Sequence, residues 1–322
     1  MSYSVAIRTL GNSLFLETEL RQIYAQTIKP ERVSIFIAEG YERPEFQIVG
    51  EEYIWVKKGM MSQRLLSYDD FHTDYILMLD DDVSLQPDSV EKLLKALNEN
   101  DADLVGADIF QNHRLPIKTK IKAVVSNLVF PHFSQKWAFK IHKNGSFSYI
   151  NHPIKNFYPS QSCAGITMLW KTNSYKKLRM QDELWLDALL FAYNDDMLES
   201  YKVFKNDMKL GVVFNSGITH LDSKSASDTF RKSPDYIKNR TIAQFAIWYR
   251  TCFNPGNSNP WNKFMAFSSF SMKMVWQFFL FIILSLVKFN FSYLTNFLKG
   301  ISEGWKFIHS EPFRSLPPYV IR

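Results

Sequence analysis

The chain is poor in cysteine. Its 322 residues include only Cys163 and Cys252, which lie far apart and lack the spacing of metal ligands. A disulfide framework is therefore excluded, and we expect the catalytic part to work in a reduced, cytoplasmic compartment. The first residues lack the pattern of a signal peptide, since apolar, strand-like residues start at Val5. Internal repeats and low-complexity tracts are also missing.

Acidic residues are fewer than basic ones. Lys and Arg number 38 against 32 Asp and Glu, which gives a net charge of +6 and a pI near 9.0. This balance suits an anionic partner, which can be a membrane surface, a nucleotide or a nucleic acid. The chain has no helix-turn-helix, zinc-finger or aromatic RNA-binding motif, so we expect no nucleic-acid partner. Hydrophobic residues make up 46%, enough for a packed core.

Short apolar runs alternate with helical patterns over the first 110 residues. We expect strands at residues 3–7, 33–38, 53–56 and 75–79, and helices at residues 14–26, 63–71 and 87–98. Such alternation predicts an α/β fold, with a mostly parallel sheet flanked by helices. In these sheets ligands bind beyond the carboxyl ends of the strands. Three segments occupy such positions: Arg8-Thr9, Glu39-Gly40 and Asp80-Asp81-Asp82.

The three adjacent aspartates are the strongest chemical signal. Their carboxylates repel one another, and a cation is the usual compensation. Carboxylate oxygens are the ligands that Mg²⁺ and Mn²⁺ prefer, with open positions left for substrate phosphates. The alternative is an acidic turn that caps the helix beginning near Pro87.

Two later features carry weaker signals. Asp195-Asp196 lies between helical patterns, so one carboxylate is a candidate general base and the alternative is an N-cap for the next helix. His220 follows an expected strand at residues 211–214. A lone histidine is usually structural, yet imidazole is also a common metal ligand.

The remaining segments organise the chain into two parts. Residues 111–160 read as an irregular wall of a substrate site, followed by regular structure at 164–170 and helices at 184–193 and 197–206. A helix over 235–251 precedes a strong Asn-, Gly- and Pro-rich breaker at 254–260. We therefore divide the chain into a catalytic domain, 1–230, and a helical carboxyl-terminal region, 231–322.

That carboxyl-terminal region is apolar and aromatic. Residues 274–287 are shorter than the roughly 20 apolar residues of a spanning helix, and extension to residue 264 includes Lys273. Lysines accompany Trp276 and Trp305, a pattern typical of a helix in the headgroup region. We expect membrane association; a helical cap on the catalytic domain or a dimer interface is the alternative.

Several motifs, taken in order, resemble a known family. They are Val5–Thr9, Gly59–Arg64, Tyr75–Val83 with Pro87-Asp88, Ser162–Gly165, Asp195-Asp196, Tyr201-Lys202, Gly211 and His220-Leu221. The set is similar to the inverting family 2 glycosyltransferases of the GT-A fold, especially bacterial enzymes that build surface polysaccharides. The resemblance covers roughly residues 3 to 222. Three segments depart from it. Ala38-Glu39-Gly40-Tyr41 replaces the usual Asp-Asp-Gly-Ser, Asp195-Asp196 replaces the common Glu-Asp and keeps the carboxylate, and Lys202 stands where Arg is common.

The resemblance implies a Rossmann-like GT-A domain and a role for each matched residue. Asp196 would be the general base. Asp82, Asp80 and His220 would hold a divalent cation, Mn²⁺ or Mg²⁺. The donor and its nucleotide would meet Arg8, Thr9, Glu39, Gln63, Arg64, Asp80 and Asp81, although Gln63 and Arg64 fit a solvated helix face equally well. Cys163, Ala164, Gly165 and Asp195 would lie on the acceptor side.

The implied activity is a metal-dependent transfer with inversion, of the hexosyl- or deoxyhexosyltransferase type. A nucleotide-sugar donor would glycosylate a hydroxyl of a glycan or lipid-linked acceptor in cell-surface polysaccharide synthesis. The enzyme would sit on the cytoplasmic face of the inner membrane, held by its carboxyl-terminal helices, with a homodimer as a further option. The alternative is a catalytically inactive, membrane-bound protein of the same fold that binds nucleotide sugars or glycans.

Overall fold

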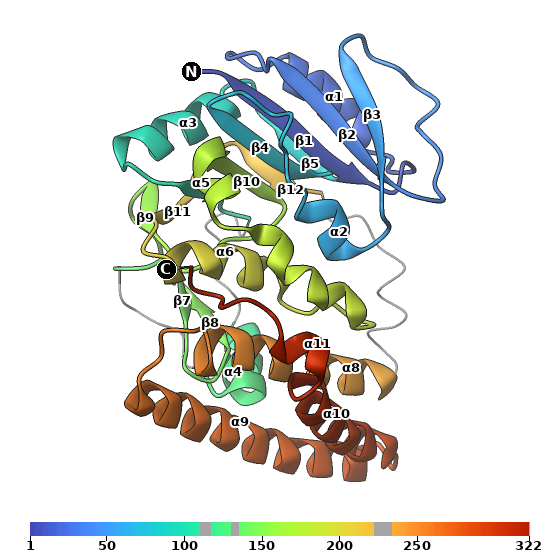
Figure 1. Cartoon of the computed structure of the whole chain (residues 1–322), viewed down its shortest axis with the longest axis vertical. Helices are drawn as coiled ribbons and strands as arrows, with labels where there is room; N and C mark the ends of the chain where they lie inside the picture. The colour runs from blue at the N-terminus through green and yellow to red at the C-terminus, as the bar shows by residue number, and fades with distance from the viewer. Residues whose placement is uncertain (110–116, 130–134, 222–233, 322) are drawn as a thin grey trace.

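An eight-stranded mixed sheet forms the centre of the molecule (Figure 1). The structure is a computed structural model that describes residues 1–109, 117–129, 135–221 and 234–321. The strand order is β3-β2-β1-β4-β10-β6-β11-β9. These strands are β1 (Tyr3–Thr9), β2 (Arg32–Ala38), β3 (Glu51–Val56), β4 (Tyr75–Asp80), β6 (Leu104–Ala107), β9 (Phe157–Pro159), β10 (Thr167–Lys171) and β11 (Leu210–Val213).

The half of the sheet that contains the amino terminus is fully parallel. β3, β2, β1 and β4 pair in parallel, whereas β10 is antiparallel to both β4 and β6. β11 runs parallel to β6, and β9 closes the edge in the antiparallel sense. The predicted fold class, a mostly parallel sheet flanked by helices, is confirmed.

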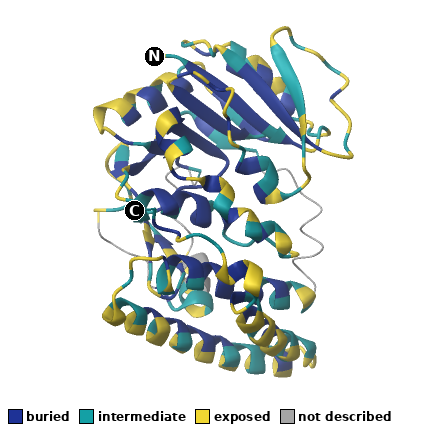
Figure 2. Ribbon diagram, viewed as in Figure 1, coloured by how far each residue is buried: buried dark blue, intermediate teal, exposed yellow. Residues whose placement is uncertain are grey.

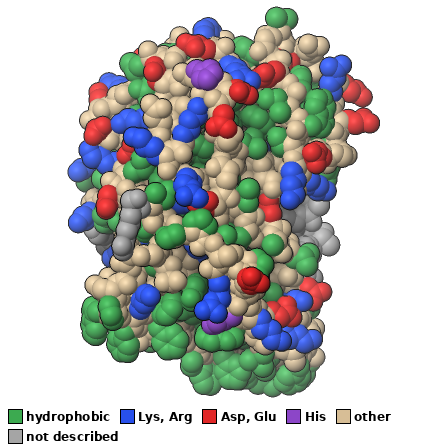
Figure 3. Space-filling model, in the orientation of Figure 1, with side chains coloured by type: hydrophobic (Ala, Val, Ile, Leu, Met, Phe, Trp, Pro, Cys, Tyr) green, Lys and Arg blue, Asp and Glu red, His purple; other side chains and the backbone are tan. Residues whose placement is uncertain are grey.

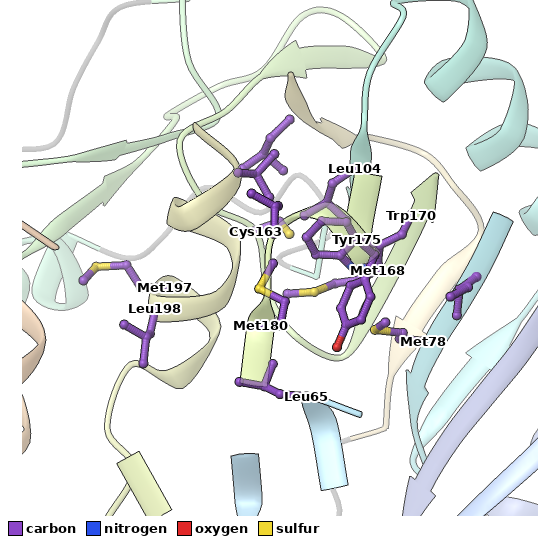
Figure 4. Packing of buried hydrophobic residues seen from close by; sticks show 14 of the residues in the cluster. Leu65, Met78, Leu104, Cys163, Met168, Trp170, Tyr175, Met180, Met197 and Leu198 are labelled. Carbon is purple, nitrogen blue, oxygen red and sulfur yellow. The ribbon is translucent and has the colours of Figure 1, made fainter. Parts of the chain in front are cut away.

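Each face of the sheet buries its own apolar cluster, because side chains alternate along a strand. On one face, α1 (Leu16–Tyr24) and α3 (Ser89–Glu99) cover Val5, Ile7 and Leu79. On the other face, α5 (Thr172–Lys177) and α6 (Asp195–Lys205) contribute to a cluster with Met78, Met168 and Trp170 (Figure 4). The sheet is therefore buried on both sides, as parallel sheets usually are.

Two short ribbons complete the sheet domain. β5 (Val83–Leu85) pairs with β12 (Ile218–His220), and β7 (Phe139–Ile141) pairs with β8 (Phe147–Tyr149). The first ribbon brings the end of the aspartate segment next to the end of β12. The second ribbon faces the carboxyl-terminal helices (Figure 1).

The carboxyl-terminal helices pack below the sheet domain in the view of Figure 1. They are α8 (Pro234–Trp248), the π-helical turn η2 (Tyr249–Phe253), α9 (Pro260–Val287), α10 (Ser292–Ile308) and α11 (Glu311–Arg314). Their apolar cluster is largely aromatic, with Trp248 stacked on Phe270 at a centroid distance of 4.0 Å. The predicted breaker is confirmed, since Asn259 caps α9 by accepting a hydrogen bond from the Asn262 amide at 2.8 Å.

Three sequence predictions about elements are wrong in part. The helix expected over 63–71 is the short α2 (Met60–Arg64), because Tyr68 and Phe71 leave the helical path to pack on Phe36. Residues 184–193 do not form an α-helix; a 3-10 helix, η1 (Met180–Ala188), lies there. The irregular segment 111–160 contains α4 (Ile117–Asn127) as well as β7, β8 and β9.

Candidate active site

The site begins where β1 and β4 end side by side. Their parallel register places Arg8 opposite Asp80, and the Arg8 Nε donates to Asp80 Oδ1 as an ion pair. The same guanidinium donates to the carbonyl oxygen of Gly165, which precedes β10. Arg8 is thus a bridge between the aspartate segment and the neighbouring turn.

The second aspartate faces the end of β1. The Thr9 hydroxyl donates to the Asp81 carboxylate, and Gln63 Nε2 donates to the Thr9 carbonyl at 3.0 Å. Burial raises the pKa of Asp81 to about 6; the Thr9 hydrogen bond opposes this effect, and the charges of Asp80 and Asp82 add to it. A partly buried carboxylate flanked by two like charges is a group that a cation would stabilise.

The third aspartate lies beside His220. Pairing of β5 with β12 sets Val83 opposite His220, and the Leu221 amide donates to the Asp82 carbonyl at 2.9 Å. As a result, His220 Nε2 is 3.2 Å from Asp82 Oδ2. Asp82 is buried, whereas 30% of the His220 side chain is exposed.

This pair fits a divalent cation that is shared with a substrate. Among the described residues no group of three His, Cys, Asp or Glu side chains is arranged as a complete metal site. Mg²⁺ and its relatives in phosphate sites commonly use one or two protein ligands, with phosphate oxygens and water completing the shell. One carboxylate and one imidazole that converge at a partly exposed position meet that requirement.

Helix α2 brings Arg64 to the site, and Asp187 holds the helix in place. The Asp187 carboxylate accepts from the amides of Met61 and Ser62 at 2.8 and 2.7 Å. It thereby satisfies donors at the helix amino terminus that would otherwise lack partners. Gly59 has to be glycine here, since a Cβ would lie 2.3 Å from Asp187 Oδ2.

Arg64 is surrounded by three carboxylates of α6. Its Nη1 lies 2.7 Å from Asp195 Oδ2 and 2.7 Å from Asp196 Oδ1, and its Nε lies 3.9 Å from Glu199 Oε2. The guanidinium is buried and Glu199 is fully buried, but 39% of the Asp196 side chain is exposed. Asp196 is therefore the member of this cluster that an incoming hydroxyl can reach.

The close approach of Arg64 and Asp196 depends on Gly165. A Cβ at this glycine would lie 2.4 Å from Arg64 Nη1 and 2.7 Å from Asp196 Oδ1. The Gly165 amide also donates to the Asp196 carboxylate. Desolvation raises the pKa of Asp196, but the charge and hydrogen bond of Arg64 together with this amide outweigh it and hold the pKa below its ordinary value.

The two neighbouring carboxyls respond in the opposite direction. Burial raises the pKa of Asp195 to about 7 and that of Glu199 to about 7, and the Arg64 charge offsets only part of this effect. Three carboxyls around one guanidinium cannot all be neutralised by it. Near neutral pH the cluster therefore keeps Asp196 ionised while its buried neighbours share protons.

A segment of the sequence that contributes to this site matches a known protein family. Residues 56–144 match the model of glycosyl transferase family 2. This segment contains α2, with Gln63 and Arg64, and the aspartates at 80–82. It ends before Gly165, Asp196 and His220, which the structure adds to the same site. Among curated proteins, no sequence matches the chain.

Similar solved structures share few identical residues with the chain. A mannosyltransferase from Pyrobaculum calidifontis in complex with GDP-Man and Mn²⁺ has 9% identity and a TM-score of 0.48, covering 97% of this chain and 82% of that one. GalNAc-T7 with UDP, GalNAc and Mn²⁺ has 10% identity and a TM-score of 0.48, covering 83% and 55%. S. aureus TarS in complex with UDP has 10% identity and a TM-score of 0.46, covering 95% and 92%.

Other residues expected from the sequence lie outside this cluster of contacts. Glu39 is exposed after β2, and its amide donates to the Val56 carbonyl at 2.8 Å. Cys163 and Ala164 are buried on opposite faces of the sheet. Lys202, considered for a phosphate contact, is fully buried and pairs with Glu183 at 2.9 Å.

Sequence reasoning missed three acidic residues that organise the site: Asp187, Glu199 and Glu183. Only Glu199 had a usable signal, because it follows Asp195 and Asp196 by one helical turn and must share their face. Asp187 and Glu183 come from η1, whose contacts depend on the tertiary fold.

A separate cavity of about 500 Å³ lies between the end of α6 and the start of β11. Its walls include Trp137, Phe157, Phe204, Lys205 and Met208. β11 and β4 run in the same direction, so the start of β11 belongs to the edge of the sheet opposite Asp80. This cavity is not part of the candidate active site.

Proposed function

We propose that this protein is a metal-dependent, inverting glycosyltransferase that uses a nucleotide sugar. The observation that carries the proposal is the meeting of two groups at one edge of the sheet. Asp82 pairs with His220 there, and Arg64 holds Asp196 nearby, with Arg8 and Gly165 connecting the two groups. The family match of residues 56–144 supports the same activity.

Asp82 and His220 would hold the divalent cation, Mn²⁺ or Mg²⁺, and Asp80 is a further ligand candidate. When bound, such an ion neutralises charge on a departing nucleoside diphosphate. The donor would lie along the residues at the ends of β1, β4 and α2: Arg8, Thr9, Gln63, Arg64, Asp80 and Asp81. Glu39, which follows β2, would lie near the nucleotide base.

Asp196 would act as the general base. Its lowered pKa keeps it ionised at neutral pH, and its partly exposed side chain is available to an acceptor hydroxyl. The hydroxyl oxygen would form a bond to the anomeric carbon as the bond from that carbon to the diphosphate breaks, while the hydroxyl proton passes to Asp196. A single displacement of this kind inverts the configuration. Arg64 and the Gly165 amide would fix the carboxylate in position.

The finer assignments follow from the same proposal. The transferred group would be a hexose or deoxyhexose, and the acceptor a glycan or lipid-linked hydroxyl that passes near Gly165 and Asp195. Synthesis of a cell-surface polysaccharide would place the enzyme on the cytoplasmic face of the plasma membrane. Residues 1–230 would form the transferase domain and residues 231–322 the membrane-associated region, with a homodimer as an option.

Replacement of the base tests the proposal. Asp196→Asn should abolish transfer, because the amide cannot accept the proton, while donor binding survives. Binding is measured as Mn²⁺-dependent thermal stabilisation by a panel of nucleotide sugars. Asp69→Asn, an exposed aspartate elsewhere, is the matched control. Loss of donor binding together with transfer would remove Asp196 from the base role. Binding without hydrolysis or transfer by the unaltered chain would favour an inactive binding protein.

A further inference from the structure

Helix α9 presents an apolar face to the outside along its whole length. It has 28 residues, is long and apolar enough to cross a membrane, and is mostly not buried within the protein. Figure 2 shows exposed residues along the outer edge of this helix, and Figure 3 shows hydrophobic side chains gathered there. We call this surface the α9 face; it consists of Trp261, Phe264, Met265, Met272, Val275, Trp276, Phe279, Ile283 and Leu286.

The opposite side of α9 is attached to the rest of the protein. Lys273 is buried and donates to the Ser146 hydroxyl at 2.8 Å. Gln277 is also buried and donates to the Ser126 carbonyl at 2.9 Å. A helix that spans a bilayer would have to break these bonds and place the lysine in hydrocarbon, which is costly. The polar attachments therefore favour a helix that stays on the protein and exposes only its outer face.

The charged residues in the sequence around α9 are all basic. Residues 236–302 contain no aspartate or glutamate but include Lys263 and Lys288, one near each end of the helix, and Lys299 on α10. Lys288 and Lys299 are exposed. A second copy docked on this face would bring lysines together without acidic partners, whereas an anionic lipid surface complements them. Tryptophans and lysines beside an apolar stripe are typical of interfacial helices.

We propose that α9 lies in the plane of an anionic bilayer, with the α9 face in the headgroup and upper acyl region and the sheet domain above it. This inference rests on the proposed membrane location of the enzyme. Membrane binding does not depend on the transfer reaction. Donor hydrolysis is therefore measured on the same protein, so that failure of the membrane proposal is distinguished from failure of the proposed transferase function.

Vesicle flotation of the full chain tests the surface. Val275→Glu with Phe279→Glu places two charges on the α9 face, and Val49→Glu with Ile154→Glu places them on two even more exposed apolar residues elsewhere. The first pair should weaken binding to phosphatidylcholine–phosphatidylglycerol vesicles by about tenfold or more, since each exposed side chain loses its burial in lipid. The control pair should retain binding. Equal binding by both variants, or no preference for the anionic vesicles over phosphatidylcholine alone, would overturn the proposal.

The depth of Trp276 separates an in-plane helix from a spanning one. This residue lies near the middle of α9, and its fluorescence is obtained as the difference between the chain and its Trp276→Phe variant. Lipids brominated near the headgroup should quench it more strongly than lipids brominated near the chain ends. Stronger quenching by the deep bromines would overturn the in-plane orientation. A vesicle-free dimer that Val275→Glu with Phe279→Glu dissociates would assign the face to a second copy instead.

Discussion

Replacement of Glu199 by glutamine should stabilise the protein in alkaline solution. Glu199 is fully buried on α6, and neither of its carboxyl oxygens has a hydrogen-bond partner among the described residues. Burial raises its pKa from 4.5 to about 7 despite the nearby Arg64. The folded state therefore binds a proton that the unfolded state has already released, and the associated stability is complete below about pH 4.5 and lost as the pH rises through about 7.

The magnitude follows from the size of that shift. A rise of this kind corresponds to up to about 3 kcal/mol lost once the carboxyl is ionised, and less if Asp195 takes up part of the change. Glu199→Gln removes the titration and keeps the shape. Its free energy of unfolding, measured in urea, should match that of the unaltered protein near pH ~4 and exceed it near pH ~8. A variant destabilised equally at both pH values would show that Glu199 is ionised and paired with Arg64 in the native protein.

Three further substitutions probe the supports of the site. Gly165→Ala should reduce transfer strongly and also lower stability, because its methyl would displace the buried Arg64 guanidinium from its carboxylates; kcat at saturating donor and thermal unfolding measure the two effects. Asp187→Ala should lower affinity for a nucleotide sugar by loosening α2, and the loss of its capping bonds should destabilise the fold by about 1–2 kcal/mol in thermal unfolding. Glu183→Gln should lower the free energy of unfolding by about 3–5 kcal/mol, since the buried cations Lys202 and Arg250 lose their counter-charge. An unchanged free energy of unfolding would mean that water reaches these two side chains.

The part of the fold that could be predicted is the part with local patterns. β1, β2 and β4 contain largely apolar runs, so Arg8 and Asp80 could be predicted to lie at the carboxyl ends of strands. The structure supplies the pairing of β1 with β4 that brings these two residues together. The helix predicted over 63–71 failed because aromatic packing around Phe36 outweighs local helical preference. The short strands within 111–160 escaped prediction because three-residue strands carry almost no periodicity.

The contacts within the candidate site likewise depend on tertiary structure more than on local sequence patterns. The proximity of His220 to Asp82 depends on the β5–β12 ribbon, and that of Arg64 to Asp196 on a glycine with no side chain. The resemblance placed these residues in one active site, and the structure supplies the contacts that join them. The role of Asp187 was invisible in the sequence, because its partners are backbone amides more than a hundred residues away.

The last described residues pack against α6, the helix that carries the proposed base Asp196. Tyr319 is fully buried, and its hydroxyl donates to the Leu198 carbonyl of α6 at 2.6 Å. Beside it, Arg250 donates to the Pro317 carbonyl at 2.5 Å as well as to Glu183. Shortening the protein from this side would therefore remove contacts that hold α6 in place, so loss of the proposed transfer activity in a truncated variant would not by itself argue against the proposed membrane binding. Tags or fusions for activity work belong at the other terminus.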